Sequence, residues 1–158
     1  MIEYRKGNLL DVTSGVIAHG VNCQGVMGSG VAKAIREKYP LAYRTYLKKV
    51  QKCVEFNNNT SALLGQVQFC STSDNEVFTG PNVVVANCFT QDFYGTDKRH
   101  VNYEAVAKCF QTLYVRSGMY GQLNIPKIGA GLGGGDWSVI ESIIKSEYKG
   151  DVIVWELA

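Results

Sequence analysis

Short, continuous apolar runs alternate along the chain with segments in which apolar residues recur at every third or fourth position. The continuous runs predict strands covered on both faces, and the periodic segments predict helices. The predicted strands are Ile2 to Arg5, Val16 to Val21, Gln66 to Cys70, Val83 to Phe89, Leu123 to Ile128 and Val152 to Trp155. The predicted helices run from Gly30 to about Tyr39, from Leu41 to about Cys53, from Asn102 to Gly118, and from Asp136 to Tyr148. Strands alternate with helices, which predicts an α/β fold with a mostly parallel sheet.

Polar residues and prolines between these segments predict where the elements start and stop. Three short polar residues precede predicted helices and can act as N-caps: Ser29, Asn102 and Asp136. Pro40 is expected to break the first helix. A turn is expected over residues 71–75, with Val77 and Phe78 as the return of a hairpin. Trp137 and Trp155 are expected in the core.

A glycine-rich stretch connects the strand that begins at Leu123 to the last helix. Five of the seven residues from Gly129 to Gly135 are glycine. Strand, glycine loop and helix N-terminus together resemble a phosphate cradle, because glycines let the backbone approach a ligand and leave N–H groups free to bind an anion. A merely flexible turn is the alternative, but it needs only one or two glycines. Gly129, Gly131 and Gly134 also match a dinucleotide-binding pattern, yet the strands that should follow in a Rossmann half are missing.

Composition bounds the class of protein. A chain of 158 residues, 46% hydrophobic and 19% charged, fits one soluble globular domain over residues 1–158, expected as a monomer. The net charge of +2 gives no strong signal for nucleic acid, and no apolar run reaches the roughly 20 residues of a membrane span. Five cysteines without CxxC spacing indicate buried free thiols in a reducing cytoplasm. No cofactor is expected, and neither histidine completes a metal-ligand pattern.

Three loops leave the carboxyl ends of predicted strands, where open α/β sheets bind their ligands. They span residues 22–28, 90–98 and 129–135. Two of them lead into glycine-rich helix N-termini, which suit two phosphates or one diphosphate.

The combined motifs resemble the macrodomain family. The matching pieces are Gly7-Asn-Leu-Leu-Asp11, Ala18-His-Gly-Val-Asn-Cys23, Val26-Met-Gly-Ser-Gly-Val-Ala32, Asn87-Cys-Phe-Thr-Gln91, Asn102-Tyr103, and the stretch from Ile125 to Trp137. They occur in the family's order and cover nearly the whole chain. The branch they resemble includes ADP-ribose 1″-phosphate phosphatases and terminal ADP-ribose protein glycohydrolases.

The resemblance implies a three-layer α/β/α fold with a mixed sheet of about six strands and a cleft for ADP-ribose. The loop from Asn22 to Gly30 would wrap the distal ribose and one phosphate, the loop from Gly129 to Gly135 would hold the diphosphate, and residues 7–9 would face the adenine. The implied ligand-binding residues are Asn8, Leu9, Asn22, Met27, Gly28, Ser29, Gly30, Val31, Gln91, Tyr94, Ile128, Gly129, Ala130, Gly131, Leu132, Gly133 and Gly134. Asn8 stands where many members have Asp, and its carbonyl can still accept a hydrogen bond.

The resemblance favours one of the two activities of this branch over the other. The glycohydrolases use a lysine and an aspartate at positions that hold Gln91 and Gly133 here, and neither can supply a Schiff base or a carboxylate. Lys127 and Asp136 are substitutes only by nearness in sequence, and Asp136 is better explained as an N-cap. The phosphatase branch has a histidine at the position of His19, and Asn22 fits the asparagine beside the distal ribose.

His19 and Asn22 are therefore the candidate catalytic residues. His19 interrupts an apolar strand three residues before the Asn22 loop, and a pKa near neutrality would let it act as an acid or a base. The alternative is a core histidine that a backbone carbonyl satisfies. Residues 98–100, Lys-Arg-His, are more simply explained as a solvated charge run.

The leading hypothesis is a macrodomain that hydrolyses ADP-ribose 1″-phosphate to ADP-ribose and phosphate. A non-catalytic reader of ADP-ribose is the first alternative. An ADP-ribosyl hydrolase that acts on modified protein or nucleic acid is the second.

Overall fold

The computed structural model describes residues 1–57, 59–72, 82–95 and 97–157. Its strands are β1 (Ile2–Lys6), β2 (Ser14–Asn22), β3 (Val67–Ser71), β4 (Asn82–Gln91), β5 (Leu123–Ile125) and β6 (Val152–Glu156). Its helices are α1 (Gly30–Lys38), α2 (Pro40–Asn57), α3 (Tyr103–Tyr120) and α4 (Trp137–Glu147), with two 3₁₀ turns, η1 (Leu9–Asp11) and η2 (Thr60–Leu63). All six predicted strands and four predicted helices are present, which confirms the α/β class.

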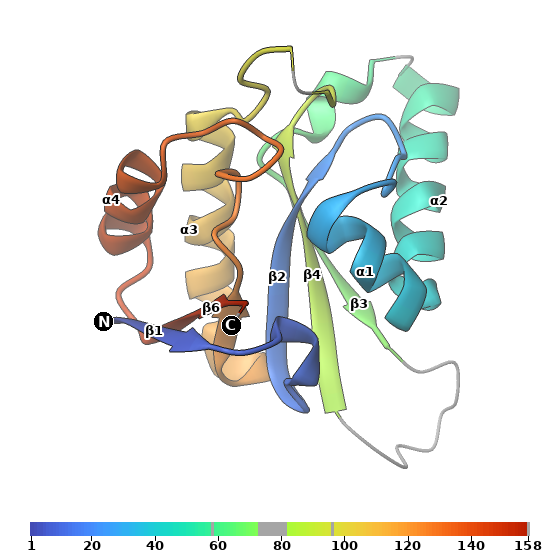
Figure 1. Cartoon of the computed structure of the whole chain (residues 1–158). Coiled ribbons are helices and arrows are strands. Elements are labelled where there is room, and N and C mark those ends of the chain that lie inside the picture. The colour runs from blue at the N-terminus through green and yellow to red at the C-terminus, as the bar shows by residue number, and fades with distance from the viewer. Residues whose placement is uncertain (58, 73–81, 96, 158) are drawn as a thin grey trace.

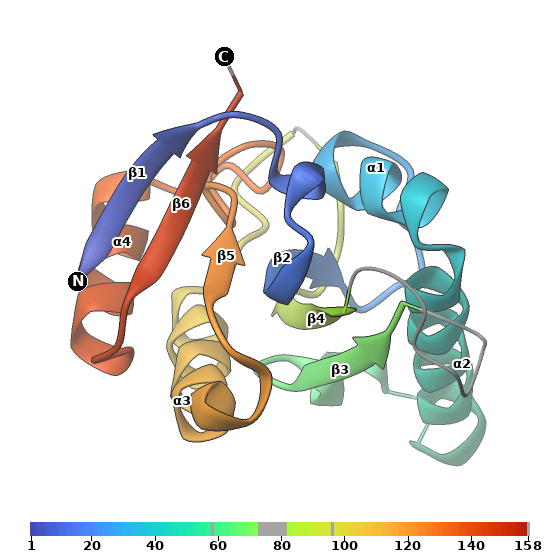
Figure 2. The same cartoon turned by 90° about the horizontal axis from the view of Figure 1, so that it is seen from below.

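The strands form one sheet in the order β1-β6-β5-β2-β4-β3. Among the six strands of the described residues, only β3 runs antiparallel to its neighbour, so the sheet is mixed and mostly parallel. Helices α1 and α2 cover one face and α3 and α4 cover the other, which gives three layers (Figure 1). Figure 2 shows the strand order along the sheet, with β1 and β3 at its two edges. The carboxyl ends of β2 and β4 therefore lie side by side at the centre of the sheet.

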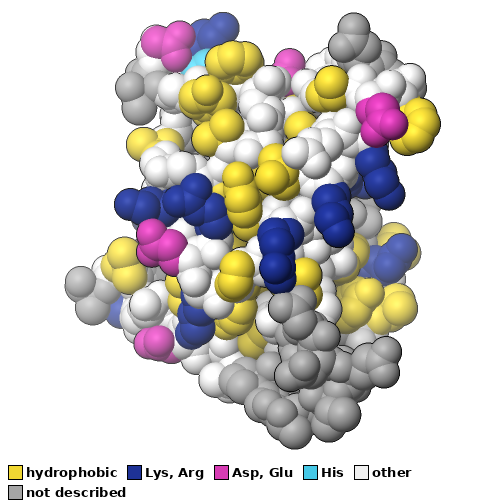
Figure 3. Space-filling view, turned by 90° about the vertical axis from the view of Figure 1, so that its right-hand side faces the viewer, with side chains coloured by type: hydrophobic (Ala, Val, Ile, Leu, Met, Phe, Trp, Pro, Cys, Tyr) yellow, Lys and Arg dark blue, Asp and Glu magenta, His cyan; other side chains and the backbone are white. Residues whose placement is uncertain are grey.

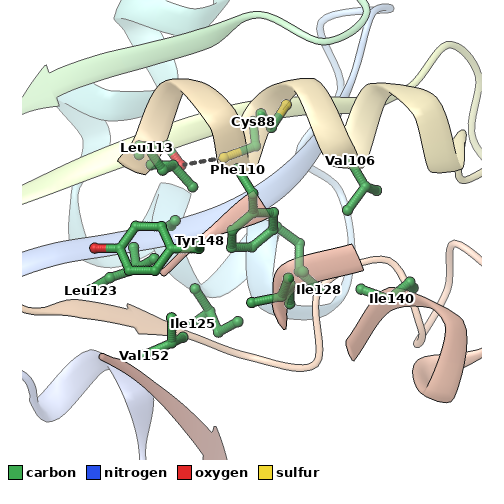
Figure 4. Packing of buried hydrophobic residues seen from close by; sticks show 14 of the residues in the cluster. Cys88, Val106, Phe110, Leu113, Leu123, Ile125, Ile128, Ile140, Tyr148 and Val152 are labelled. Carbon is green, nitrogen blue, oxygen red and sulfur yellow. Dashed lines mark hydrogen bonds between the residues drawn. The ribbon is translucent and has the colours of Figure 1, made fainter. Parts of the chain in front are cut away.

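Alternation along β2 sends its side chains to both faces of the sheet. Val16 and Ala18 join the cluster under α3 and α4, which contains Phe110, Ile125 and Ile140 (Figure 4). Ile17 packs in a cluster with Ile35 of α1, and Val21 packs in another with Tyr46 of α2. This double burial explains why the strand has no polar face, and it places His19 inside the protein.

Two of the expected helix ends are corrected by the structure. Helix α3 continues past Gly118 to Tyr120 and stops before Gly121, whose φ of 94° is readily adopted only by glycine. Helix α2 begins at Pro40 and extends to Asn57, beyond the expected end near Cys53. Pro40 is favourable there, because the first turn of a helix needs no N–H from that residue.

The expected caps differ in outcome. The side chains of Asn102 and Asp136 accept hydrogen bonds from Ala105 N and Ser138 N, so both caps are confirmed. Ser29 occupies the N-cap position of α1, but its side chain makes no capping hydrogen bond, and that expectation is wrong. The amides at the start of α1 therefore receive no hydrogen bond from the Ser29 side chain.

Other expectations are confirmed in part. All five cysteines are buried and free, and burial raises the pKa of Cys23 to about 12. Trp137 and Trp155 are only partly buried and pack against the edges of the core. The expected strand after Leu123 ends at Ile125 instead of Ile128. Val77 and Phe78 lie outside the described residues. No described helix has the length and hydrophobicity needed to cross a membrane.

Candidate functional site

A cavity of about 380 Å³ opens where the loops after β2 and β4 meet the glycine loop and the N-terminus of α1. This is the end of the sheet at the top of Figure 1. The residues that line it are His19, Gly20, Val21, Asn22, Val26, Gly28, Ser29, Gly30, Val31, Ala32, Thr90, Gln91, Tyr94, Gly95, Pro126, Lys127, Ile128, Gly129, Gly131, Leu132 and Gly133. The three loops expected at the carboxyl ends of strands thus share one pocket.

The glycine loop folds back on itself and leaves several amides unused. Its internal hydrogen bonds run from Gly134 N to Gly131 O at 3.1 Å and from Gly135 N to Gly129 O at 2.9 Å. Among the described residues, no acceptor contacts the N–H groups of Gly129, Gly131, Leu132 and Gly133. All four residues line the pocket. A row of unpaired N–H groups is the arrangement that binds phosphate oxygens.

The N-terminus of α1 adds a second set of free amides. The first helical hydrogen bond runs from Lys33 N to Ser29 O at 3.2 Å, so Gly30, Val31 and Ala32 have no acceptor within the helix. Their residues line the same pocket. A Cβ on Gly30 would lie 3.4 Å from Leu132 Cδ1, which shows how closely the helix start approaches the glycine loop. The helix dipole adds positive potential at this end.

The loop over residues 22–28 is held by side chains. Asn22 Oδ1 accepts hydrogen bonds from Gln24 N at 2.9 Å and Tyr46 Oη at 2.8 Å, and Asn22 Nδ2 donates to Val26 O at 2.8 Å. Tyr46 Oη also accepts from Gly25 N at 3.0 Å. Both ends of the Asn22 amide are occupied within the loop, so in this arrangement Asn22 determines the loop's shape.

His19 is buried in the wall of the pocket and bound to Asn87 on the adjacent strand. His19 Nε2 lies 2.6 Å from Asn87 Oδ1, and Asn87 Nδ2 donates to Ala42 O and Gln68 Oε1. With its amide nitrogen committed as a donor, Asn87 presents an acceptor to His19, so Nε2 carries the proton and Nδ1 a lone pair. Burial lowers the pKa of His19 to about 4, against a smaller opposing effect of the Asn87 hydrogen bond.

This environment corrects the expected chemistry of His19. The pKa is not near neutrality, because the charged imidazolium would have to exist away from water. At neutral pH the ring is uncharged, so it cannot act as a proton donor from the imidazolium form. The expectation of a backbone carbonyl partner is also wrong, since the partner is a side chain amide.

Two buried polar side-chain atoms in the described part of the chain have no hydrogen-bond partner: His19 Nδ1 and Thr90 Oγ1. Both residues line the pocket. Folded proteins rarely leave such atoms unpaired, and exceptions occur where a ligand or water completes the set. The residues with unpaired side-chain atoms and those with unpaired amides therefore surround one cavity.

Gln91 and Tyr94 occupy the side of the pocket formed by the end of β4 and the loop after it. Gln91 Nε2 donates to Phe93 O at 2.7 Å, and a Cβ on Gly133 would lie 3.0 Å from Gln91 Oε1. Tyr94 is exposed and stacks on Phe93 with ring centroids 5.1 Å apart. The two positions that would carry glycohydrolase chemistry are thus neighbours here, but they hold an amide and no side chain.

Five residues implied by the resemblance do not line this cavity: Asn8, Leu9, Met27, Ala130 and Gly134. Asn8 caps η1, and Leu9 and Met27 are buried in core clusters. These residues were implied because they stand within or beside a matching motif. Successive side chains of a segment point in different directions, so not every residue of a motif faces the cavity. The residues that line the cavity but were not named individually as ligand-binding or catalytic are Gly20, Val21, Val26, Ala32, Thr90, Gly95, Pro126 and Lys127. Thr90 could have been found, because it lies at the carboxyl end of a buried strand as Asn22 does.

The basic run at residues 98–100 is only partly a solvated charge run. Lys98 and Arg99 are exposed, and Arg99 lies over the Tyr103 ring. The His100 side chain is only 5% exposed, and its Nε2 lies 2.8 Å from Asp97 Oδ1. His100 N also donates to Gly133 O at 2.9 Å, which ties this loop to the glycine loop.

Comparison with known proteins supports the fold and includes the loops that line the pocket. A model of the macro domain matches residues 18–144. An ADP-ribose 1″-phosphate phosphatase of Scheffersomyces stipitis is 32% identical over 92% of this chain and 94% of its own. A DNA ADP-ribosyl glycohydrolase of Mycobacterium tuberculosis is 24% identical over 94% of this chain and 39% of its own. A macrodomain protein from Streptomyces coelicolor has a similar structure, with a TM-score of 0.73, 27% identity and 99% of both chains covered. The matched region contains every residue that lines the pocket, and the chain belongs to the macro domain family.

Proposed function

We propose that this chain binds ADP-ribose and hydrolyses ADP-ribose 1″-phosphate to ADP-ribose and inorganic phosphate. The observation that carries the proposal is the meeting of two separate sets of unpaired backbone amides at one pocket. One set could hold a diphosphate and the other a further phosphate. The relative from Scheffersomyces stipitis, which aligns over most of both chains, is named for this reaction.

In the proposed reaction a water oxygen attacks the terminal phosphorus and the bond to the ribose 1″ oxygen breaks. That oxygen takes up a proton, and phosphate leaves. Such transfer depends mainly on positioning and on stabilising the charge on the phosphoryl oxygens. The amides of Gly131, Leu132 and Gly133 and those that start α1 are fixed donors for that purpose.

His19 contributes as a neutral acceptor in this scheme. Its Nδ1 lone pair is available at any pH well above 4, because burial keeps the ring uncharged. It would accept a hydrogen from the attacking water or from a ribose hydroxyl in the pocket. Asn87 fixes the tautomer that leaves this lone pair free. Asn22 would act through the loop that it shapes.

The proposed phosphatase is favoured over a glycohydrolase that acts on modified protein or nucleic acid. The Mycobacterium tuberculosis relative named for such an activity is only 24% identical, and this chain spans 39% of it. Gln91 and Gly133, although adjacent, supply neither an amine nor a carboxylate. A protein that binds ADP-ribose without hydrolysing a substrate would use the same amides. The following experiment distinguishes such a protein from a phosphatase.

The test is phosphate release from ADP-ribose 1″-phosphate, measured beside calorimetric binding of ADP-ribose to the same preparation. Release together with binding supports the proposal. Tight binding without turnover would make the chain a reader of ADP-ribose. The Gly131→Glu variant is the matched control for contaminating phosphatases, because it should abolish both signals together.

A further inference from the structure

The charge of the molecule is unevenly distributed. Seven of the sixteen Lys and Arg lie between residues 30 and 57, together with only two of the fourteen Asp and Glu. That segment, which consists of α1 and α2, has a formal charge of +5, and the rest of the chain has a charge of −3. The small net charge of +2 therefore hides a strongly basic segment beside an acidic remainder.

These charges gather on one face of the molecule, because α1 and α2 cover the same side of the sheet. Figure 3 shows this face, with Lys and Arg side chains spread over it and few acidic ones among them. Along α2, Arg44, Lys48 and Lys52 recur at every fourth position and are exposed. Lys33 of α1 is exposed as well. We call these four residues, with Arg36, Lys38 and Lys49, the basic face.

Three cations outside the basic face have a carboxylate partner, whereas three on the basic face have none among the described residues. Elsewhere Arg5, Lys127 and Lys145 each lie within 3.3 Å of a carboxylate oxygen. Between described residues, no ion pair includes Lys33, Lys48 or Lys52. Like charges four residues apart on a helix cost stability, roughly 0.2–0.5 kcal/mol a pair. Lys33, Lys48 and Lys52 therefore repel one another without a carboxylate partner among the described residues.

We propose that the basic face binds the phosphate backbone of a nucleic acid. Helix α2 has 18 residues and is about 27 Å long, a length of duplex that carries about 16 phosphates. Its exposed cations are about 6 Å apart along the axis, so several can contact phosphates at once. A membrane surface fits less well, because the exposed apolar side chains of α2, Val54 and Phe56, lie only at its last turn.

The basic face lies beside the pocket, because α1 contributes to both. Its first residues supply free amides to the pocket, and Lys33 follows within the same turn. A polymer on this face would therefore run past the pocket mouth. The proposal does not depend on the phosphatase reaction, since Lys33, Lys48 and Lys52 line no part of the cavity.

The test is fluorescence polarisation of the full chain with a labelled 20-base-pair DNA duplex, with RNA duplex and single strands as parallel probes. If at least three phosphates are neutralised, Kd should rise about 40-fold or more between 50 and 200 mM salt. The variant Lys33→Gln, Lys48→Gln, Lys52→Gln should lose most of this affinity, and its salt slope should fall by about 3.

The matched control removes the same charge from the opposite face, with Lys108→Gln, Lys145→Gln and Lys149→Gln. It should bind almost as the unmodified chain does. Equal losses in both variants would mean that only overall charge matters, and would overturn the proposal. So would the absence of binding at 50 mM salt, or binding only to anionic vesicles or to an acidic peptide. Hydrolysis of free ADP-ribose 1″-phosphate should be unchanged in both variants, so failure of either proposal leaves the other readout intact.

Discussion

The two loops that supply amides to the pocket are built in opposite ways. The glycine loop is shaped by its own backbone, with Gly129 and Gly134 at φ values of 78° and 73° that other residues rarely adopt. The loop over residues 22–28 is shaped by side chains, above all Asn22 and Tyr46. Its support comes from α2, more than twenty residues further along the chain.

This difference predicts different responses to substitution. The glycine loop should tolerate change where a side chain has room and fail where backbone atoms already touch. A Cβ on Gly131 would meet nothing within 4 Å, whereas one on Gly133 would lie 2.8 Å from Gly129 O. The loop over residues 22–28 should lose its shape when a side chain that hydrogen-bonds to it is removed, even though the substituted residue lies outside the pocket.

The largest effect is expected from Gly131→Glu. The side chain fits sterically, but its carboxylate would stand among the amides that bind phosphate. ADP-ribose binding should fall at least about 10³-fold, or roughly 4 kcal/mol, with an unchanged melting temperature without ligand. Calorimetry and thermal unfolding measure both.

Gly131→Ala is the control for the added carbon atom alone and should bind nearly normally. Normal binding by a folded Gly131→Glu protein would place the phosphate site elsewhere.

A second effect concerns His19 and the pH dependence of stability. Its pKa is lowered from 6.5 to about 4 in the folded chain, so between these values the unfolded chain binds more protons. The stability contributed by the neutral ring is fully present above pH 6.5 and is lost as pH falls toward 4. It amounts to about 3 kcal/mol. Urea unfolding from pH 7 to pH 4 should show this loss.

His19→Gln is the matched variant, because it removes the titrating ring and keeps a polar side chain. Between pH 7 and pH 4, the free energy of unfolding of His19→Gln should fall by about 3 kcal/mol less than that of the unmodified chain. Phosphate release should drop roughly 10²-fold to 10⁴-fold if Nδ1 acts on the substrate. Full turnover per folded molecule would exclude His19 from the reaction and leave it a structural role.

Tyr46→Phe should have the next largest effect. It removes the hydroxyl that accepts from Gly25 N and contacts Asn22 O at 2.7 Å, and it leaves buried polar groups unpaired. The expected cost is about 1–3 kcal/mol in the free energy of unfolding, with weaker ADP-ribose binding because the loop loses its support. Denaturant unfolding and calorimetry provide the two numbers.

Tyr43→Phe, one turn earlier on α2 and only half-buried, is the control. Equal losses of stability and ADP-ribose affinity in both variants would mean that the Tyr46 hydroxyl does not specifically support the loop over residues 22–28.

Sequence reasoning succeeded where the cause is local. The strands covered on both faces, the caps at Asn102 and Asp136 and the glycine loop each follow from neighbouring residues. It failed where the cause lies far along the chain. The tautomer of His19 depends on Asn87, which is 68 residues away and is joined to it only when β2 pairs with β4.

The pocket lining shows the same limit. Thr90 and Lys127 enter it because β4 and the glycine loop end at the same edge of the sheet as β2. Leu9 and Met27 leave it because their side chains fill the core. A motif indicates which segment meets a ligand, but the direction of each side chain is decided by packing.

The smallest expected effect is a difference in melting temperature between ligands. It tests which part of ADP-ribose each loop holds. If the glycine loop holds the diphosphate and the loop over residues 22–28 holds the distal ribose, ADP-ribose uses both and AMP reaches only part of the first. A tenfold difference in Kd corresponds to about 1.4 kcal/mol at saturating ligand, or roughly 3–6 °C in melting temperature for a chain of this size. ADP-ribose should therefore raise the melting temperature more than equal concentrations of AMP or NAD, whose nicotinamide places a ring where the terminal phosphate would sit. Tyr46→Phe should narrow the gap between ADP-ribose and AMP, because it weakens only the loop that AMP does not reach. An equal shift with NAD, or an unchanged gap in Tyr46→Phe, would contradict this assignment of the two loops.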